Sequence, residues 1–205
     1  MTVTRGQPWG ELGPLPDDGV IVRSDAEAAA VVAAARAAGE APPPVGLLGG
    51  DLCRTLGGRG DEARLHTPDA ARLVVDVLLV RLDDGDERVA VAHVIVRGRT
   101  WLHGPIDAVM NAAWMGEWNV APRAHPNDGM ADVVHADLSL GDRFKARSRL
   151  PLGTHVPHPG IRTTRNDTVR IESRRTRRVW IDGVAAGAAR RVEVRLEPDA
   201  LRVVV

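Results

Sequence analysis

The chain has 205 residues, of which 44% are hydrophobic and 26% are charged, and this balance excludes a disordered chain as the starting expectation. Lys plus Arg and Asp plus Glu both number 27, so no overall charge attracts nucleic acid, and we expect no nucleic-acid partner. Cys53 is the only cysteine, which excludes an internal disulfide and a zinc site built from cysteines. A lone cysteine fits a reducing compartment and no window is long enough to span a bilayer, so we expect a cytoplasmic protein.

The N-terminal part predicts an arm followed by a strand and a helix. Residues 1–18 are rich in Pro, Gly and Asp, which is typical of a flexible arm. Residues 20–22 are a short apolar strand candidate. Ser24 and Glu27 then form a capping box, in which each side chain satisfies a backbone N–H group at a helix start. The alanine-rich run that follows predicts a helix that ends at Gly39.

A second strand and helix follow directly. Residues 45–48 predict a strand, and a Gly-Gly turn within residues 49–57 leads into a short helix. Another short helix is expected at Thr67, with Pro68 at its first position. Strand, helix, strand and helix in this order predict a fragment of a parallel α/β sheet over residues 19–73.

After residue 73 the pattern changes to strands. Residues 74–82 and 88–96, joined by an aspartate-glycine turn, predict a β-hairpin. The sequence does not decide between helix and strand for residues 104–114, although Pro105 and the following alanines favour a helix. A helix is expected at 142–150, and further strands at 131–137, 168–173, 178–181, 191–196 and 201–205. Residues 74–205 are therefore expected to form a mostly β domain.

Four short motifs stand in order along this second part. They are Asn111 to Val134 (NAAWMGEWNVAPRAHPNDGMADVV), Leu152 to Pro159 (LGTHVPHP), Val179 to Gly183 (VWIDG) and a closing strand at 200–205. They resemble the diacylglycerol kinase-like (YegS-like) lipid kinases, which read N-G, G-G, A-P-x-A and D-D-G-x-L-D-V-V across the first stretch. The resemblance implies an α+β protein: a small remnant of a parallel α/β NAD kinase/diacylglycerol kinase-like domain, then a β-sandwich domain. It also favours a strand ending near Asn111.

The resemblance implies two nucleotide motifs, both degenerate here. Where the family has a G-G-D-G-T turn for the phosphates of ATP, this chain keeps Asp25 but lacks the glycines, and Glu27 adds a carboxylate that opposes polyphosphate binding. The capping box explains the same residues without a ligand. The second motif keeps Gly49, Gly50 and Asp51. We therefore regard ATP as doubtful.

The β domain carries two further candidates. The resemblance implies a structural Mg²⁺ site with Asp128 as ligand, and a plain Asx turn is the alternative. It also implies a catalytic aspartate at Asp182 that accepts the proton of a lipid hydroxyl, and a hairpin turn is the alternative. His155 and His158 are a weaker candidate pair of metal ligands.

Three functions stay open at this stage. The first is a degenerate lipid kinase homologue that binds lipid or a partner without efficient ATP-dependent phosphoryl transfer. The second is an active minimal lipid kinase, and the third is a structural interaction module. The seven arginines within residues 162–178 either bind an anionic membrane surface or form a solvated face. A homo-oligomer or a protein partner is also open.

Overall fold

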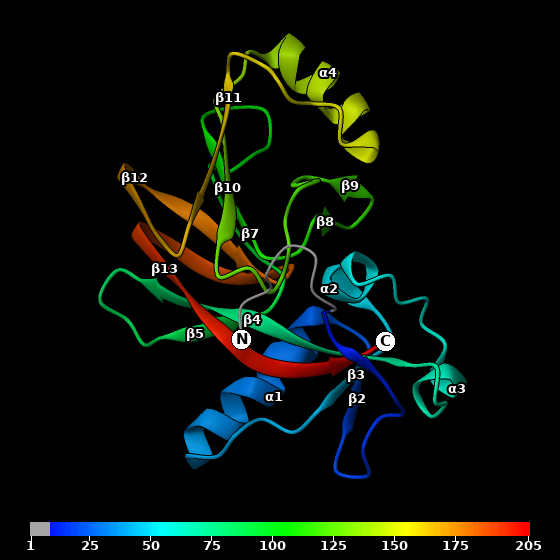
Figure 1. Ribbon diagram of the computed structural model, residues 1–205. Coiled ribbons are helices and arrows are strands. Elements are labelled where there is room, and N and C mark those ends of the chain that lie inside the picture. Colours follow the sequence, from blue (N-terminus) through cyan, green and yellow to red (C-terminus); the bar gives the residue numbers. More distant parts are fainter. Residues whose placement is uncertain (1–8) are drawn as a thin grey trace.

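Antiparallel strands dominate the protein, of which a computed structural model describes residues 9–205. The strands are β1 (Glu11–Leu12), β2 (Val20–Val22), β3 (Val45–Leu47), β4 (Ala71–Leu82), β5 (Arg88–Ala90), β6 (His93–Arg97), β7 (Ile106–Met110), β8 (Trp114–Met115), β9 (Trp118–Asn119), β10 (Ala131–Ala136), β11 (Ile161–Asn166), β12 (Thr168–Ile181) and β13 (Val184–Val204). The helices are α1 (Asp25–Ala38), α2 (Gly50–Thr55), α3 (Glu62–Leu65), α4 (Leu140–Arg149) and the 3₁₀ turn η1 (Leu150–Leu152). Figure 1 shows α1 and α4 at opposite ends of the molecule.

The main sheet has 11 strands, of which eight follow the order β1-β4-β13-β12-β6-β7-β10-β11. Strands β2, β3 and β5 pair beside this path, and β8 and β9 form a separate two-stranded sheet. The long strands β12 and β13 change register between Glu172 and Arg177 and between Glu197 and Leu201, where bulges bend the sheet. Apolar side chains of β4, β13 and β12 therefore meet those of β6, β7 and β10 in one core. The protein contains a β-sandwich domain.

The strands β2 and β3 run parallel, and β3 pairs in parallel with the last residues of β13. Since α1 follows β2 and α2 follows β3, the N-termini of both helices lie at the same edge of the sheet (Figure 1). Side chains of α1, α2 and these strands form a second core with one end of β4 and β13. This arrangement brings the sequence-predicted residues of both turns together.

Most of the predicted elements are confirmed. Ser24 accepts the N–H of Glu27 at 3.2 Å, and Glu27 accepts the N–H of Arg23 at 2.7 Å, which completes the capping box of α1. Gly39 ends the helix with a φ of 72°, a conformation that favours glycine. The open segment 104–114 contains strand β7, and the strand alternative is correct.

Three expectations for the N-terminal half of the chain need correction. The flexible arm expected at residues 1–18 does not apply to residues 9–18, because β1 pairs with β4 and Leu15 is buried; residues 1–8 lie outside the described residues. The helix expected at Thr67 lies earlier, as α3, because the Asp61 carboxylate caps it by accepting the N–H groups of Ala63 and Arg64. The predicted strand 88–96 is two strands, of which only β5 pairs with β4.

The C-terminal strands are longer than the sequence indicates. The two strands expected at 168–173 and 178–181 are one strand, β12, and those expected at 191–196 and 201–205 are one strand, β13. Bulges interrupt the alternation of side chains without ending these strands. Strand β11 and the small β8–β9 ribbon were not predicted. No helix among residues 9–205 is long and apolar enough to cross a bilayer.

Candidate functional site

The Asp25 carboxylate lies against the N-terminus of α2. It accepts the backbone N–H of Asp51 at 2.6 Å and that of Leu52 at 3.1 Å. A β-carbon at Gly50 would collide with this carboxylate, and one at Gly49 would collide with the Arg23 carbonyl. The two glycines therefore let the turn after β3 pack against the turn after β2. The helix N–H groups that would face a phosphate already have an anionic partner from the chain itself.

Burial raises the pKa of Asp25 to about 6; the nearby carboxylates of Asp182 and Asp51 add to this, and its two backbone hydrogen bonds oppose it. The second glycine-turn candidate, Asp51, behaves differently. Its burial acts to raise its pKa, but a hydrogen bond from His93 and the charge of that ring outweigh burial and lower it.

Asp51 connects α2 to two other elements. Its Oδ2 lies 2.9 Å from Nε2 of His93, and its Oδ1 accepts the N–H of Gly116 in the β8–β9 turn at 2.7 Å. His93 is buried, and while burial alone would lower its pKa, the hydrogen bond to Asp51 and the charges of Asp182 and Asp25 raise it. This buried hydrogen bond joins α2 to β6, and it favours the protonated form of His93 beside the ionised form of Asp51.

Asp182 forms the turn between β12 and β13 and is 8% exposed. One carboxylate oxygen accepts the N–H of Val91 at 2.8 Å, and the other accepts those of Ala92 and His93, both at 2.9 Å. These bonds hold residues 91–93, at the break between β5 and β6. Burial raises the pKa of Asp182, against the effect of these hydrogen bonds and of the His93 charge. The structure therefore brings Asp25, Asp51 and Asp182 within electrostatic reach of one another.

Asp128 belongs to a different group. Its Oδ1 accepts the N–H of Met130 at 3.1 Å, which is an Asx-type turn, and its Oδ2 pairs with Arg165. The neighbouring Asp76 lies in the middle of β4 and accepts the N–H groups of Gly129 and Asp199, each at 2.9 Å. Burial raises the pKa of Asp76 to about 6, and the Asp128 charge adds to this shift.

This arrangement does not fit a cation at Asp128. The guanidinium of Arg165 already balances that carboxylate, and the oxygens of Asp76 face N–H donors. Among residues 9–205 no group of three or more His, Cys, Asp or Glu side chains is placed to hold a metal ion. In the candidate pair His155 and His158, Nδ1 of His158 accepts the N–H of Gly160 at 3.1 Å, and its Nε2 lies 4.0 Å from Oδ1 of Asp142.

The Asp128→Asn variant tests the ion site. We expect it to lose about 1 kcal/mol of stability, the typical net value of the hydrogen bond that it weakens. The loss should be the same with added Mg²⁺ and with chelator, because only an ion that binds the folded state would make it depend on Mg²⁺. Urea denaturation of wild type and variant in both buffers measures it. A loss that appears only with Mg²⁺ present would restore the cation site.

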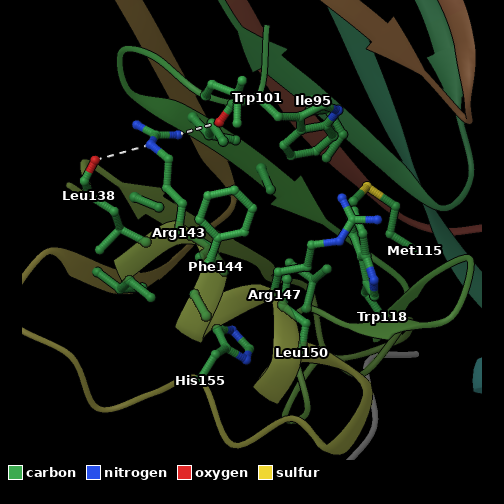
Figure 2. Close-up of a pocket in the computed structure, with 18 residues that line it drawn as sticks. Ile95, Trp101, Met115, Trp118, Leu138, Arg143, Phe144, Arg147, Leu150 and His155 are labelled. Carbon is green, nitrogen blue, oxygen red and sulfur yellow. Dashed lines mark hydrogen bonds between the residues drawn. The ribbon is translucent and has the colours of Figure 1, made fainter. Parts of the chain in front are cut away.

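A cavity of about 150 Å³ lies between the sheet and helix α4. Figure 2 shows its labelled side chains. It is almost wholly apolar, and its walls come from β6, β7 and β10, the β8–β9 ribbon, α4 and the loop after η1. No residue of α4 is buried, and Phe144 is 61% exposed. Helix α4 thus leaves its apolar side open over the cavity.

Basic and aromatic side chains surround this cavity. Arg143 donates to the carbonyls of Trp101, Gly104 and Leu138, so it ties α4 to the loop after β6 (Figure 2). The guanidinium of Arg147 lies 5.2 Å from the ring of Trp118, which meets Trp101 edge to face. The site therefore combines an apolar interior with a cationic, aromatic rim.

Residues 79–205, more than half of the chain, match the family model of the YegS C-terminal NAD kinase beta sandwich-like domain. The chain belongs to this family. The resemblance to the YegS-like and diacylglycerol kinase-like lipid kinases is thus confirmed, and it rests on the β-sandwich that carries the cavity. No curated protein sequence matches this YegS-like chain.

Solved structures share the fold. A protein from Bacillus anthracis, named in its crystal structure as a diacylglycerol kinase, superposes with a TM-score of 0.59 and 14% identity, over 91% of this chain and 75% of that one. A second crystal structure from the same organism, of a protein described there as a "putative diacylglycerol kinase", gives a TM-score of 0.66 and 14% identity, over 91% and 77% of the two chains. At this identity the likeness shows the fold alone.

Sequence reasoning missed several residues of these sites. Asp76 lies within an apolar strand pattern, and a charged residue in such a run indicates a buried polar site that the sequence analysis could have noted. His93 and Arg143 carry no local signal, since their partners lie far away along the chain. The cavity itself has no sequence signature.

Proposed function

We propose that this YegS-like protein holds the aliphatic chain of a lipid in the cavity beneath α4, and that it does so without efficient ATP-dependent phosphoryl transfer. The cavity is the observation that supports the proposal. An engineered apolar cavity of about 150 Å³ in another protein stays dry and binds benzene, so this one has room for about six carbon atoms. The rest of a longer chain would leave past Phe144, which is exposed.

The rim suits a lipid taken from an anionic membrane surface. Arg143, Lys145, Arg147 and Arg149 all lie on α4, beside the exposed Leu140 and Phe144. A basic residue near an anionic surface contributes about 1 kcal/mol of attraction, and exposed apolar side chains add to it. In the arginine-rich strands, by contrast, Arg177 is largely buried on Asp107, and only its neighbours such as Arg174 and Arg175 are exposed.

The two glycine turns support the proposal that phosphoryl transfer is inefficient. In this proposal the β2-α1-β3-α2 segment is a reduced remnant of a nucleotide-binding domain, which the family resemblance places N-terminal to the sandwich. Asp25 occupies the α2 N-terminus, and Glu27 is used in the α1 capping box. An active minimal kinase would need the three N–H bonds of Asp182 to open before that carboxylate could take a proton. We place the protein in the cytoplasm, and leave a protein partner or a second copy as the third alternative.

Filling the cavity should weaken lipid binding. We expect Ala146→Trp, which adds an indole to the α4 wall, to weaken binding of cis-parinaric acid at least about tenfold, equal to about 1.4 kcal/mol. Fluorescence titration with the free fatty acid and with probe-loaded anionic vesicles measures the affinity.

The matched control is Ser148→Trp, which adds the same side chain at an exposed position of the same helix. It should bind the probe as the wild type does. Equal binding by Ala146→Trp and Ser148→Trp would show that the cavity is not the lipid site.

Millimolar Mg-ATP should leave the melting temperature unchanged. A ligand at 100 times its Kd would stabilise the fold by about 2.7 kcal/mol, which raises the melting temperature by several degrees in a chain of this size. We expect no such shift, because the Asp25 carboxylate faces the α2 N–H groups. Thermal denaturation with Mg-ATP, and with MgCl₂ alone as the reference, measures it. A shift of about 5 °C with Mg-ATP only would favour the active minimal kinase.

A further inference from the structure

Strands β7 and β10 line a second site, on the face opposite the cavity beneath α4. Ala108 of β7 and Val134 of β10 line that cavity, whereas their neighbours Asp107 and His135 line a groove of about 680 Å³. Successive side chains of a strand point to opposite faces, so the sheet itself separates the two sites. The other wall of the groove comes from β12. Its volume lies within the range of small-molecule sites.

His135 presents one ring nitrogen to this groove. Its Nδ1 lies 2.6 Å from Oδ1 of Asp107, and Oδ2 of Asp107 accepts a hydrogen bond from Arg177 at 2.5 Å. A carboxylate that pairs with a guanidinium only accepts hydrogen bonds, so Nδ1 of His135 carries a proton. The opposite nitrogen, Nε2, makes no hydrogen bond with any of residues 9–205 and is not buried, and the side chain is 33% exposed. Nε2 is therefore open to a ligand in the groove.

Asp107 fixes how the ring responds to a ligand. Because Nδ1 of His135 donates to Asp107 in both charge states of the ring, a second proton can add at Nε2 without any reorientation. The protonated ring then donates Nε2–H to an anion. Thr164, which also lines the groove, adds a neutral donor: its Oγ1 accepts from Asn166 at 3.1 Å, so its own O–H proton is left for a ligand.

Three arginines give the groove a positive charge. Arg162 of β11 lies directly opposite His135 in the antiparallel pair, so both side chains are on the same face of the sheet. Arg174 and Arg175 line the groove from β12. All three are exposed, and none of them makes an ion pair or hydrogen bond through its side chain within the described part of the chain.

The carboxylates of the groove do not cancel this charge. Asp107 pairs with Arg177, and Arg170 pairs with Glu193 at 3.4 Å. Glu172 is the one further carboxylate among the described residues that line the groove. Three arginines without a partner thus face one such carboxylate, and the charge of the groove suits an anion.

We propose that this groove binds the phosphate group of a soluble phosphate monoester, with His135 and Arg162 on one side of the phosphate and the arginines of β12 on the other. A phosphate offers three terminal oxygens, so donors from both walls can reach it, and guanidinium groups match its geometry. A planar carboxylate offers only two. The groove opens on the face opposite α4, away from any membrane that α4 contacts, so a soluble ester suits it better than a lipid headgroup.

Glycerol 3-phosphate and glycerol test the site, since they differ only in the phosphate. We expect the wild type to bind glycerol 3-phosphate with a Kd of about 1 mM or lower, and to show no binding of glycerol at the same concentrations. NMR titration measures both affinities. It also follows the ¹⁵N shift of Nε2 of His135, which glycerol 3-phosphate alone should move toward the value of a protonated nitrogen.

Arg162→Gln should weaken the binding of glycerol 3-phosphate about five- to tenfold, because it removes one charge-assisted hydrogen bond. The matched control is Arg202→Gln, which removes the same charge from an exposed position of β13 outside the groove and should bind as the wild type does. His135→Leu should weaken binding by a similar factor. If that variant does not fold, the ring shift in the wild type and the Arg162→Gln affinity still decide the matter.

Sedimentation with vesicles of phosphatidylcholine and phosphatidic acid tests the headgroup as the alternative source of the phosphate. Wild type and Arg162→Gln should sediment to the same extent. If Arg162→Gln alone loses vesicle binding and glycerol 3-phosphate does not bind, the groove takes a headgroup and the soluble ligand is refuted. An unmoved ring shift, or equal weakening by Arg162→Gln and Arg202→Gln, also refutes it. None of these results depends on the cavity beneath α4, which Ala146→Trp tests.

Discussion

We expect the Asp182→Ala variant to lose at least about 3 kcal/mol of unfolding free energy, because three buried N–H groups lose their acceptor at about 1–3 kcal/mol each. These are the N–H groups of Val91, Ala92 and His93, which no strand partner takes over. Asp182 also has a φ of 47°, a conformation that disfavours alanine. Asp182→Asn keeps one oxygen and tolerates this conformation, so its loss should be smaller. Urea denaturation measures both variants.

Asp83→Ala is the matched control. Asp83 also has a positive φ, of 50°, and accepts two backbone N–H groups, those of Arg190 and Arg191, but these bonds are exposed. Water can replace the lost acceptor there, so we expect a loss of about 1 kcal/mol. If Asp182→Ala were no less stable than Asp83→Ala, the Asp182 carboxylate of the wild type would not be needed for stability. The general-base role that the family resemblance implies for it would then regain support.

The second large effect is expected at Arg177, whose replacement by methionine should cost about 3–5 kcal/mol, since it leaves a buried carboxylate without its cation. Its Nη1 donates to Asp107 Oδ2 at 2.5 Å, and its Nη2 donates to the carbonyls of Val96 and Pro105 at 2.6 and 2.8 Å. The other oxygen of Asp107 lies 2.6 Å from His135 Nδ1. One buried pair thus connects β6, β7, β10 and β12.

Arg174→Met is the control for this variant, because Arg174 is exposed on the same strand and its replacement should change stability by less than about 0.5 kcal/mol. The double variant Arg177→Met with Asp107→Leu should recover part of the loss, since removing both charges ends the uncompensated burial. Denaturation curves of the wild type, Arg177→Met, Asp107→Leu and the double variant form a double-mutant cycle. If Arg177→Met were as stable as the wild type, Arg177 would belong to the solvated arginine face.

The sequence by itself determined the local elements whose causes lie within a few residues. Ser24 and Glu27 specify the start of α1, and Gly39 specifies its end, because capping groups and their partners are at most four residues apart. The motifs from Asn111 onward identified the family in the same way, through their spacing along the chain. The bends in β12 and β13 were misread as strand ends, since a bulge disturbs the alternation as a turn does.

Only the tertiary structure decided what the candidate residues do. Asp25 and Asp182 were found by motif, but their partners are 26 to 91 residues away, and those contacts use both carboxylates for backbone N–H groups. The cavity beneath α4 exists because Arg143 ties the helix to the loop after β6 while no residue of α4 is buried. Whether a helix packs down or stands off depends on long-range contacts that no local pattern encodes. His155 was therefore a loop histidine in the sequence, and only the fold buried it in the wall of this cavity.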